Sequence, residues 1–127
     1  MQESSKFSIQ ARLKSFSFAI EGLKTFFIQE HNARIHFLAA LFAILLGLLL
    51  GISKLEWIGI LFAIAFVLCT EVINTAIEGI ANFISPEIHL AIKNIKDLAA
   101  AAVLIAAICA AIVGGIIFLP KIYSLFI

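Results

Sequence analysis

The chain has 127 residues, of which 63% are hydrophobic and 13% are charged, and its net charge is only +1. This composition lies outside the range of soluble domains and is typical of integral membrane proteins. The length fits one domain over residues 1–127, and the small net charge argues against a nucleic-acid partner. Cys69 and Cys109 lie in separate apolar runs without metal-binding spacing, so we expect both to be small buried hydrophobes.

Residues 9–29 have an amphipathic helical pattern. Apolar side chains repeat at three- and four-residue steps, and polar side chains repeat on another face, as at Lys14, Glu21 and Lys24. The pattern predicts a helix that lies in the membrane interface, with its basic residues toward the lipid phosphates. Packing of this helix against its own bundle is a compatible alternative.

Three apolar segments follow, each long enough to cross a bilayer as a helix. They are residues 35–52, 55–84 and 98–119. Gly47 and Gly51 form a GxxxG pattern in the first segment, a weak indication of close helix packing. We expect residues 88–97 to form a short polar loop and Pro120 to end the third span. The sequence therefore predicts an all-α membrane protein with three transmembrane helices and an N-terminal surface helix.

Basic residues are distributed unequally between the two sides that three spans would create. The side of the N-terminus carries Lys6, Arg12, Lys14, Lys24, Arg34, Lys93 and Lys96. The other side carries Lys54 and Lys121. The positive-inside rule then predicts a multi-pass membrane protein whose N-terminus is cytoplasmic.

Polar residues in the second span are the main functional signal. One stripe of this otherwise apolar helix carries Glu71, Asn74, Glu78 and Asn82. A span of roughly 20 helical residues that begins at Trp57 would place Glu71 inside the membrane, roughly 10 Å from its inner end. An ionised side chain at mid-bilayer costs roughly 2.5–3.5 kcal/mol, so such groups are retained where they face a partner or a wet site.

Other polar residues collect at the same membrane edge. They comprise Glu30, Asn32, Arg34, Glu87, His89, Lys93, Lys96 and Asp97. Carboxylate and amide oxygens suit Mg²⁺, which keeps waters and phosphate oxygens among its ligands, and Lys and Arg side chains suit the phosphates. A partly desolvated carboxylate can take a proton from a hydroxyl. This combination is what phosphoryl transfer needs, although the chain has no Walker A loop and no protein-kinase motif.

The chain resembles the small bacterial integral-membrane lipid kinases, the diacylglycerol kinase and undecaprenol kinase family. The resemblance is carried by EVINTAIE at Glu71–Glu78, EHNARIH at Glu30–His36, SPEIH at Ser85–His89 and KDLAAAAVL at Lys96–Leu104. It implies a homotrimeric bundle in the bacterial inner membrane. It also implies that ATP, with Mg²⁺, donates a phosphoryl group to a lipid alcohol at the cytoplasmic interface.

The resemblance further implies a role for each matching residue. Glu71 is similar to the catalytic base that acts on the lipid hydroxyl, and Arg12 is expected beside the lipid substrate. Glu30 and Glu78 resemble the Mg²⁺ ligands. The positions similar to the ATP-binding residues are Glu30, Asn74, Glu78, Glu87, His89, Lys96 and Asp97. Asn82 departs from the family, which usually has Asp at this position, so one negative charge is missing.

The residues leave two alternatives to a kinase. A small proton-coupled exporter would explain a glutamate in the membrane, but it would not explain Glu78 on the same stripe. A non-catalytic membrane scaffold is favoured by Asn82 alone. The substrate also stays open, because diacylglycerol and undecaprenol both present a hydroxyl at the interface. The EHNARIH form resembles the undecaprenol-type branch more closely.

Overall fold

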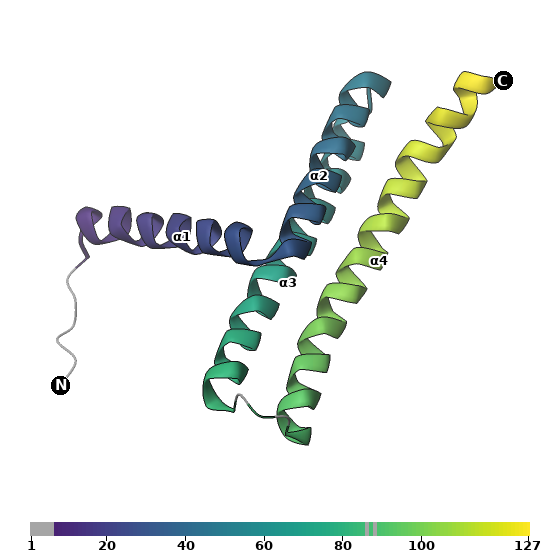
Figure 1. The fold of residues 1–127 in the computed structure, drawn as a ribbon. Coiled ribbons are helices and arrows are strands. Elements are labelled where there is room, and N and C mark those ends of the chain that lie inside the picture. Colours follow the sequence, from purple (N-terminus) through teal and green to yellow (C-terminus); the bar gives the residue numbers. More distant parts are fainter. Residues whose placement is uncertain (1–6, 86, 88) are drawn as a thin grey trace.

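A computed structural model describes residues 7–85, 87 and 89–127, and it contains four helices over these residues. They are α1 (Ile9–Gln29), α2 (His31–Leu50), α3 (Lys54–Ile84) and α4 (Leu90–Phe126). The last three lie side by side, with α3 packed mainly against α4, and α1 leaves them at a steep angle (Figure 1). These three are long and apolar enough to cross a membrane. The all-α membrane class with an N-terminal helix and three spans is therefore confirmed.

The α3–α4 hairpin extends past the level of α1. The junction between α1 and α2 lies near the middle of α3, so the last part of α3 and the first part of α4 continue beyond it (Figure 1). A surface helix marks the level where the membrane ends. With α1 in the interface, this end of the hairpin stands in the aqueous phase.

Helix α1 touches the bundle at its C-terminal end. Phe26 is its buried residue, and Phe27 packs edge-on against Phe26 and Phe37, with ring centroids 5.2 and 5.4 Å apart. Leu13 and Phe16 are exposed, as are the other large apolar side chains farther from the junction. An apolar helix face without protein contacts fits the membrane interface. The structure thus favours the interfacial placement of α1 over packing against its own bundle.

Arg34 fixes the angle between α1 and α2. Its guanidinium donates hydrogen bonds to the carbonyl oxygens of Phe27 (3.0 Å) and Ile28 (2.6 Å). These carbonyls belong to the last turn of α1, where a cation is favourable because the helix dipole is negative there. The sequence placed Arg34 among the cations suited to phosphates, whereas the structure gives it this structural role.

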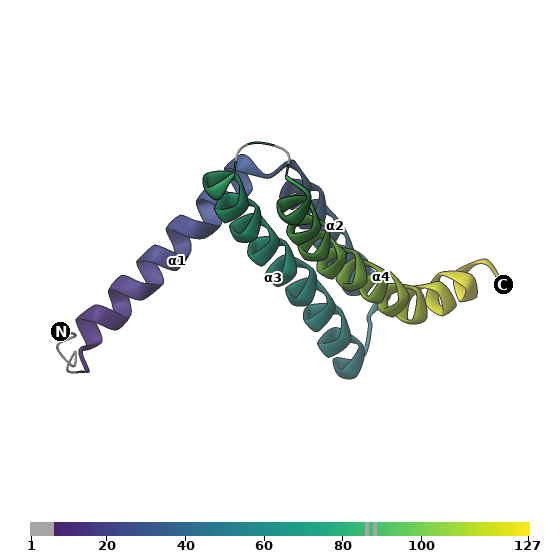
Figure 2. The same cartoon turned by 90° about the horizontal axis from the view of Figure 1, so that it is seen from below.

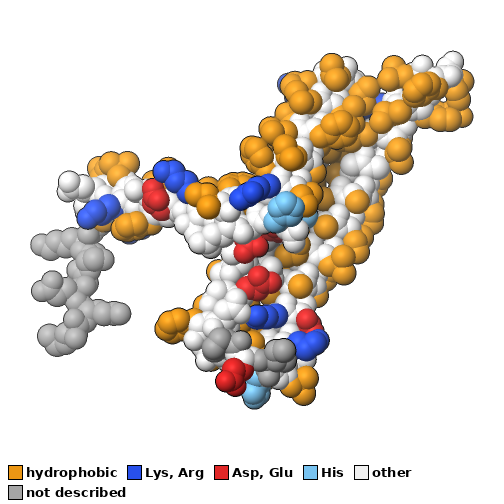
Figure 3. Space-filling view, viewed as in Figure 1, with side chains coloured by type: hydrophobic (Ala, Val, Ile, Leu, Met, Phe, Trp, Pro, Cys, Tyr) orange, Lys and Arg blue, Asp and Glu red, His pale blue; other side chains and the backbone are white. Residues whose placement is uncertain are grey.

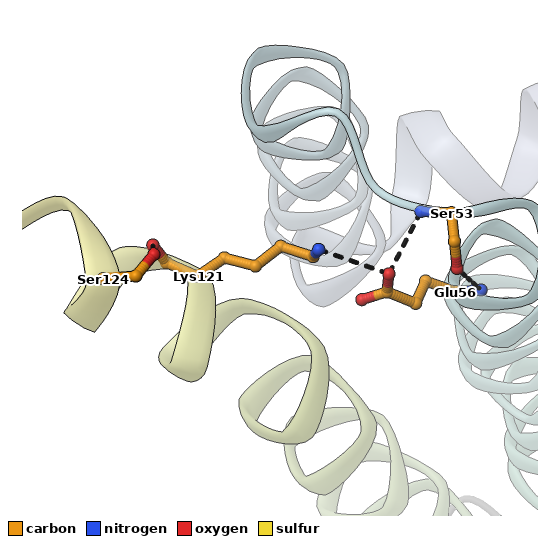
Figure 4. A network of polar contacts seen from close by, with 4 residues as sticks. All are labelled: Ser53, Glu56, Lys121 and Ser124. Atoms are coloured by element: carbon orange, nitrogen blue, oxygen red, sulfur yellow. Dashed lines mark hydrogen bonds and ion pairs between the residues drawn. The ribbon is translucent and has the colours of Figure 1, made fainter.

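A tight turn joins α2 to α3 at the opposite end of the bundle. Gly51 ends α2 in the left-handed conformation (φ +62°), which favours glycine. Ser53 and Glu56 then form a capping box at the start of α3. The Glu56 carboxylate also lies 3.4 Å from the Nζ of Lys121 on α4 (Figure 4). This ion pair ties the end of α4 to the α2–α3 turn.

Pro120 does not end the third span, contrary to the expectation from sequence. Helix α4 continues through it to Phe126, although its last turns diverge from the axis of the rest (Figure 2). Proline removes one backbone hydrogen bond and bends a helix, but neighbouring elements can hold such a segment in a membrane protein. Here Ile117 and Phe118 are buried against Ile52 and Ile60, and Lys121 pairs with Glu56.

The prediction of a polar loop at residues 88–97 is also wrong for most of this segment. Helix α4 begins at Leu90, and the Nδ1 of His89 caps it by accepting a hydrogen bond from the Ala91 amide (3.2 Å). Ile88 lies outside the described residues. Lys93 and Asp97 pair along the helix at 2.6 Å. Such (i, i+4) pairs stabilise an exposed helix, so polarity here marks the first turns of a helix and not a loop.

The two cysteines were expected to be buried, and this prediction is also wrong. Cys69 and Cys109 are both exposed on the surface of the single chain. Three long apolar helices leave most of their side chains facing outward, toward lipid or another chain. A cysteine within an apolar run is therefore no sign of burial here.

Gly47 accommodates the indole ring of Trp57. A Cβ added at Gly47 would lie 2.8 Å from the Cη2 atom of Trp57. We therefore expect Gly47→Ala to lower the unfolding free energy by about 1–3 kcal/mol, the usual cost of overpacking. Thermal unfolding in detergent micelles would measure this effect. Gly22→Ala is the matched control, because a Cβ at Gly22 would meet nothing within 4 Å. Equal melting temperatures for the two variants would contradict the prediction.

Candidate functional site

The polar stripe of α3 runs from the interior of the bundle to solvent. Glu71 is the buried charged residue of the described chain, at 6% exposure. Asn74 and Glu78 are half-buried, and Asn82 is exposed. Because one helix carries all four, their alignment follows from its 3.6-residue period. Burial therefore decreases along the stripe, from a buried carboxylate at the inner end to an exposed amide at the outer end.

His36 faces Glu71 from the neighbouring helix. The imidazole Nδ1 lies 3.6 Å from the Glu71 Oε1, and the two side chains are 26% and 8% exposed. His36 lies roughly 7.5 Å along α2 from its first residue, His31. Glu71 therefore lies slightly beyond the level of α1 along the bundle.

Asn74 provides an unsatisfied acceptor one turn beyond Glu71. Its Oδ1 atom is buried and accepts no hydrogen bond from any part of the chain that the structure describes. A buried acceptor without a donor is costly, so this atom favours a ligand that brings a donor or a cation.

Acidic side chains gather where α1 meets α2 and α3, and toward the far end of α3, with Lys and Arg close by (Figure 3). Glu30 forms the joint between α1 and α2, and its carboxylate makes no hydrogen bond or ion pair with the described residues. The same holds for Glu78 on α3. The opposite end of the bundle is mainly apolar in this view. In this view, the charged side chains of the described residues thus gather mainly at one end of the bundle.

The described residues contain no cluster of three or more His, Cys, Asp or Glu side chains that would hold a metal ion. This arrangement still fits Mg²⁺, which usually binds through one or two carboxylates and completes its shell with water and substrate phosphates. Glu30 and Glu78, which have no partner among the described residues, are carboxylates of that kind.

A second polar region lies at the α3–α4 connection. It is a cavity of about 240 Å³ that opens to solvent, and its lining includes Glu87, His89, Lys93, Lys96 and Asp97. The structure thus brings together four of the seven positions expected to bind ATP. The other three, Glu30, Asn74 and Glu78, belong to the stripe and the α1–α2 joint.

Lys96 connects this cavity to the stripe. Its Nζ donates a hydrogen bond to the Oδ1 of Asn82, at 2.5 Å. Asn82 lies one turn beyond Glu78 on α3, so the stripe leads directly to the cavity. Together, the stripe and the cavity form one polar track that runs from the buried Glu71 carboxylate to the lysines of the cavity.

Arg12 is not part of this track within one chain. It lies in the first turn of α1, roughly 25 Å along the helix axis from Gln29. Its guanidinium lies over the ring of Phe7, 5.7 Å from the centroid. A single chain therefore does not bring Arg12 to Glu71.

His36 is the site residue that sequence reasoning left without a role. The run EHNARIH drew attention to it, but the residue that it faces depends on how α2 packs on α3. An imidazole early in a membrane span, at the same depth as a glutamate on the next span, was the available signal. His36 also borders an apolar groove of about 350 Å³ between α2, α3 and α4, lined largely by alanines such as Ala39 and Ala107.

Comparison with known proteins places these features in a family. The profile of the prokaryotic diacylglycerol kinase family matches residues 17–118. The chain is 37% identical over 108 residues to an undecaprenol kinase of Bacillus subtilis, covering 85% of this chain and 88% of that protein. It is 34% identical over 116 residues to a diacylglycerol kinase of Synechocystis, covering 91% and 66%. It is 30% identical over 100 residues to a diacylglycerol kinase of Escherichia coli, covering 79% and 82%.

Proposed function

The chain belongs to the prokaryotic diacylglycerol kinase family, and we propose that it transfers the γ-phosphoryl group of ATP to the hydroxyl of a membrane lipid alcohol. Its relatives are phosphotransferases that act on an alcohol. One observation carries the proposal for this chain: the buried carboxylate of Glu71 lies on a polar track that ends in a cavity lined by lysines. A lipid hydroxyl and a soluble nucleotide can meet only at a membrane boundary.

Glu71 serves in this proposal as the base that receives the hydroxyl proton. A positioned carboxylate within reach of a hydroxyl is the usual general base for such a step. The lipid chains stay in the apolar phase while the hydroxyl reaches Glu71. His89, Lys96 and Asp97, with Glu87 and Asn74, bind the nucleotide along the track.

The same proposal assigns Glu30 and Glu78 to Mg²⁺. The metal, when bound, neutralises charge on the nucleotide phosphates, which phosphoryl transfer requires. Lys96 adds a positive charge from the α4 side. Because its partner Asn82 is a neutral amide, the charge of Lys96 is not offset by a carboxylate from the stripe.

We place the active protein in the bacterial inner membrane as a homotrimer with a cytoplasmic N-terminus. The excess of Lys and Arg on the side of α1 supports this orientation. The distance between Arg12 and the rest of the track supports an assembly, because Arg12 would then act at the site of a neighbouring chain.

A panel of lipid alcohols with radiolabelled ATP tests the proposed function. The purified protein in mixed micelles is expected to label undecaprenol more efficiently than diacylglycerol, because the chain is 37% identical to the undecaprenol kinase and 34% and 30% identical to the two diacylglycerol kinases. Organic extraction separates the labelled lipid from ATP. Absence of labelled product with every alcohol would support a scaffold, and substrate-coupled proton movement in vesicles would support an exporter. A preference for diacylglycerol would overturn the proposed substrate but not the kinase activity.

A further inference from the structure

The one ion pair that Glu71 forms among the described residues is with His36, at 3.6 Å. No lysine or arginine of the described chain contacts this carboxylate. A base that takes a proton in each turnover must lose it again before the next one. At 6% exposure, Glu71 has little direct access to water for this step.

We propose that His36 is the positioning residue that holds Glu71 and relays its proton to solvent. This inference rests on the proposed kinase function. The side chain of His36 is 26% exposed on the single chain, compared with 8% for Glu71, so the imidazole is the more accessible of the two groups. Neutral imidazole is the side chain best suited to exchange protons near neutral pH.

The proposed relay carries one proton per turnover from the lipid hydroxyl to water. As the lipid oxygen attacks the γ-phosphorus, an O–P bond forms and the bond between the γ-phosphorus and its bridging oxygen breaks, which releases ADP. The hydroxyl proton moves to Glu71. The proton then passes from the Glu71 carboxyl to the free electron pair on Nδ1 of His36, in the tautomer that carries hydrogen on Nε2. The imidazolium releases its Nε2 proton to water. The resulting Nδ1–H tautomer then returns to the Nε2–H form by proton exchange with water, so both groups regain their starting state.

The other cationic side chains that form ion pairs or hydrogen bonds in the described chain have partners other than Glu71. The described ion pairs and hydrogen bonds engage Lys24 with Glu21, Arg34 with the α1 carbonyls, Lys93 with Asp97, Lys96 with Asn82 and Lys121 with Glu56. Glu30 and Glu78 form no ion pair with His36, and α4 lines the groove beside it with Ala107, Ala110 and Ala111. Among the ion pairs of the described residues, His36 therefore takes part only in the one with Glu71.

The test compares His36→Gln with His31→Gln in the kinase assay. His31 is the matched control, because it is the exposed first residue of the same helix. We expect His36→Gln to lower kcat by at least about 10-fold, since positioned proton transfer contributes roughly 10²–10⁴-fold. The KM for ATP is expected to stay unchanged. The shape of the pH–rate profile should differ between the wild type and the variant, because glutamine cannot exchange a proton with Glu71.

Chemical rescue separates a relay from a structural role. Free imidazole added to His36→Ala is expected to restore turnover, because it can occupy the space beside the groove. A kcat for His36→Gln equal to that of the His31→Gln control, or an unchanged pH profile, would overturn the relay. So would a loss of activity that imidazole does not restore. An inactive wild-type protein would overturn the kinase function itself, whereas an active wild type with an unaffected His36 variant would overturn the relay alone.

Discussion

Replacement of Glu71 by glutamine is expected to abolish lipid phosphorylation while the folded protein stays at least as stable. Glutamine keeps the size and hydrogen-bonding shape of the side chain but has no carboxylate to accept the hydroxyl proton. Loss of a positioned base lowers kcat by roughly 10²–10⁴-fold. Stability is spared because an uncharged amide is cheaper to bury than a carboxylate at 6% exposure. Initial rates with radiolabelled ATP, together with thermal unfolding in the same detergent, measure both effects.

Glu56→Gln is the matched control for this experiment. It makes the same chemical change on the same helix, but Glu56 pairs with Lys121 at the opposite end of the bundle. We expect this variant to keep wild-type turnover. Wild-type-like turnover in Glu71→Gln would remove the base assignment. A loss of turnover in both variants, with a lowered melting temperature, would mean that the effect comes from folding.

The sequence was sufficient to predict the position of each helix and the residues that share one face of it. The apolar runs identified α2, α3 and α4, and the period of α3 placed Glu71 and Glu78 on one stripe. The amphipathic pattern also gave α1 its observed bounds, Ile9–Gln29. These features follow from local hydrophobicity and helical geometry, which a sequence states directly.

Contacts between helices could not be predicted in this way. The hydrogen bond from Lys96 to Asn82 and the approach of His36 to Glu71 depend on the depth and rotation at which two helices pack. Pro120 was misread for a related reason. Proline is a strong local breaker, yet packing against the α2–α3 turn keeps α4 helical to Phe126. Tertiary contacts therefore decided the points where local rules failed.

Replacement of Lys96 by methionine is expected to lower kcat/KM for ATP by about 10²–10³-fold, the usual cost of removing one positioned group that stabilises developing charge. The Nζ of Lys96 is held at 2.5 Å by the neutral amide of Asn82, so its full charge remains available to a phosphate. Methionine keeps the length and apolar stem of the side chain. Initial rates measured over a range of ATP concentrations would give kcat and KM separately.

Lys93→Met supplies the control on the same face of α4. Lys93 lines the same cavity, but its charge is offset by Asp97 at 2.6 Å, and both of these side chains are 62% exposed. Exposed pairs contribute little, so neither the stability nor the kinetics of this variant should change much. Equal losses in the two variants would show that the cavity attracts nucleotide through general positive charge. A loss confined to Lys96→Met would assign the phosphate contact to the one lysine that α3 holds in place with an uncharged partner.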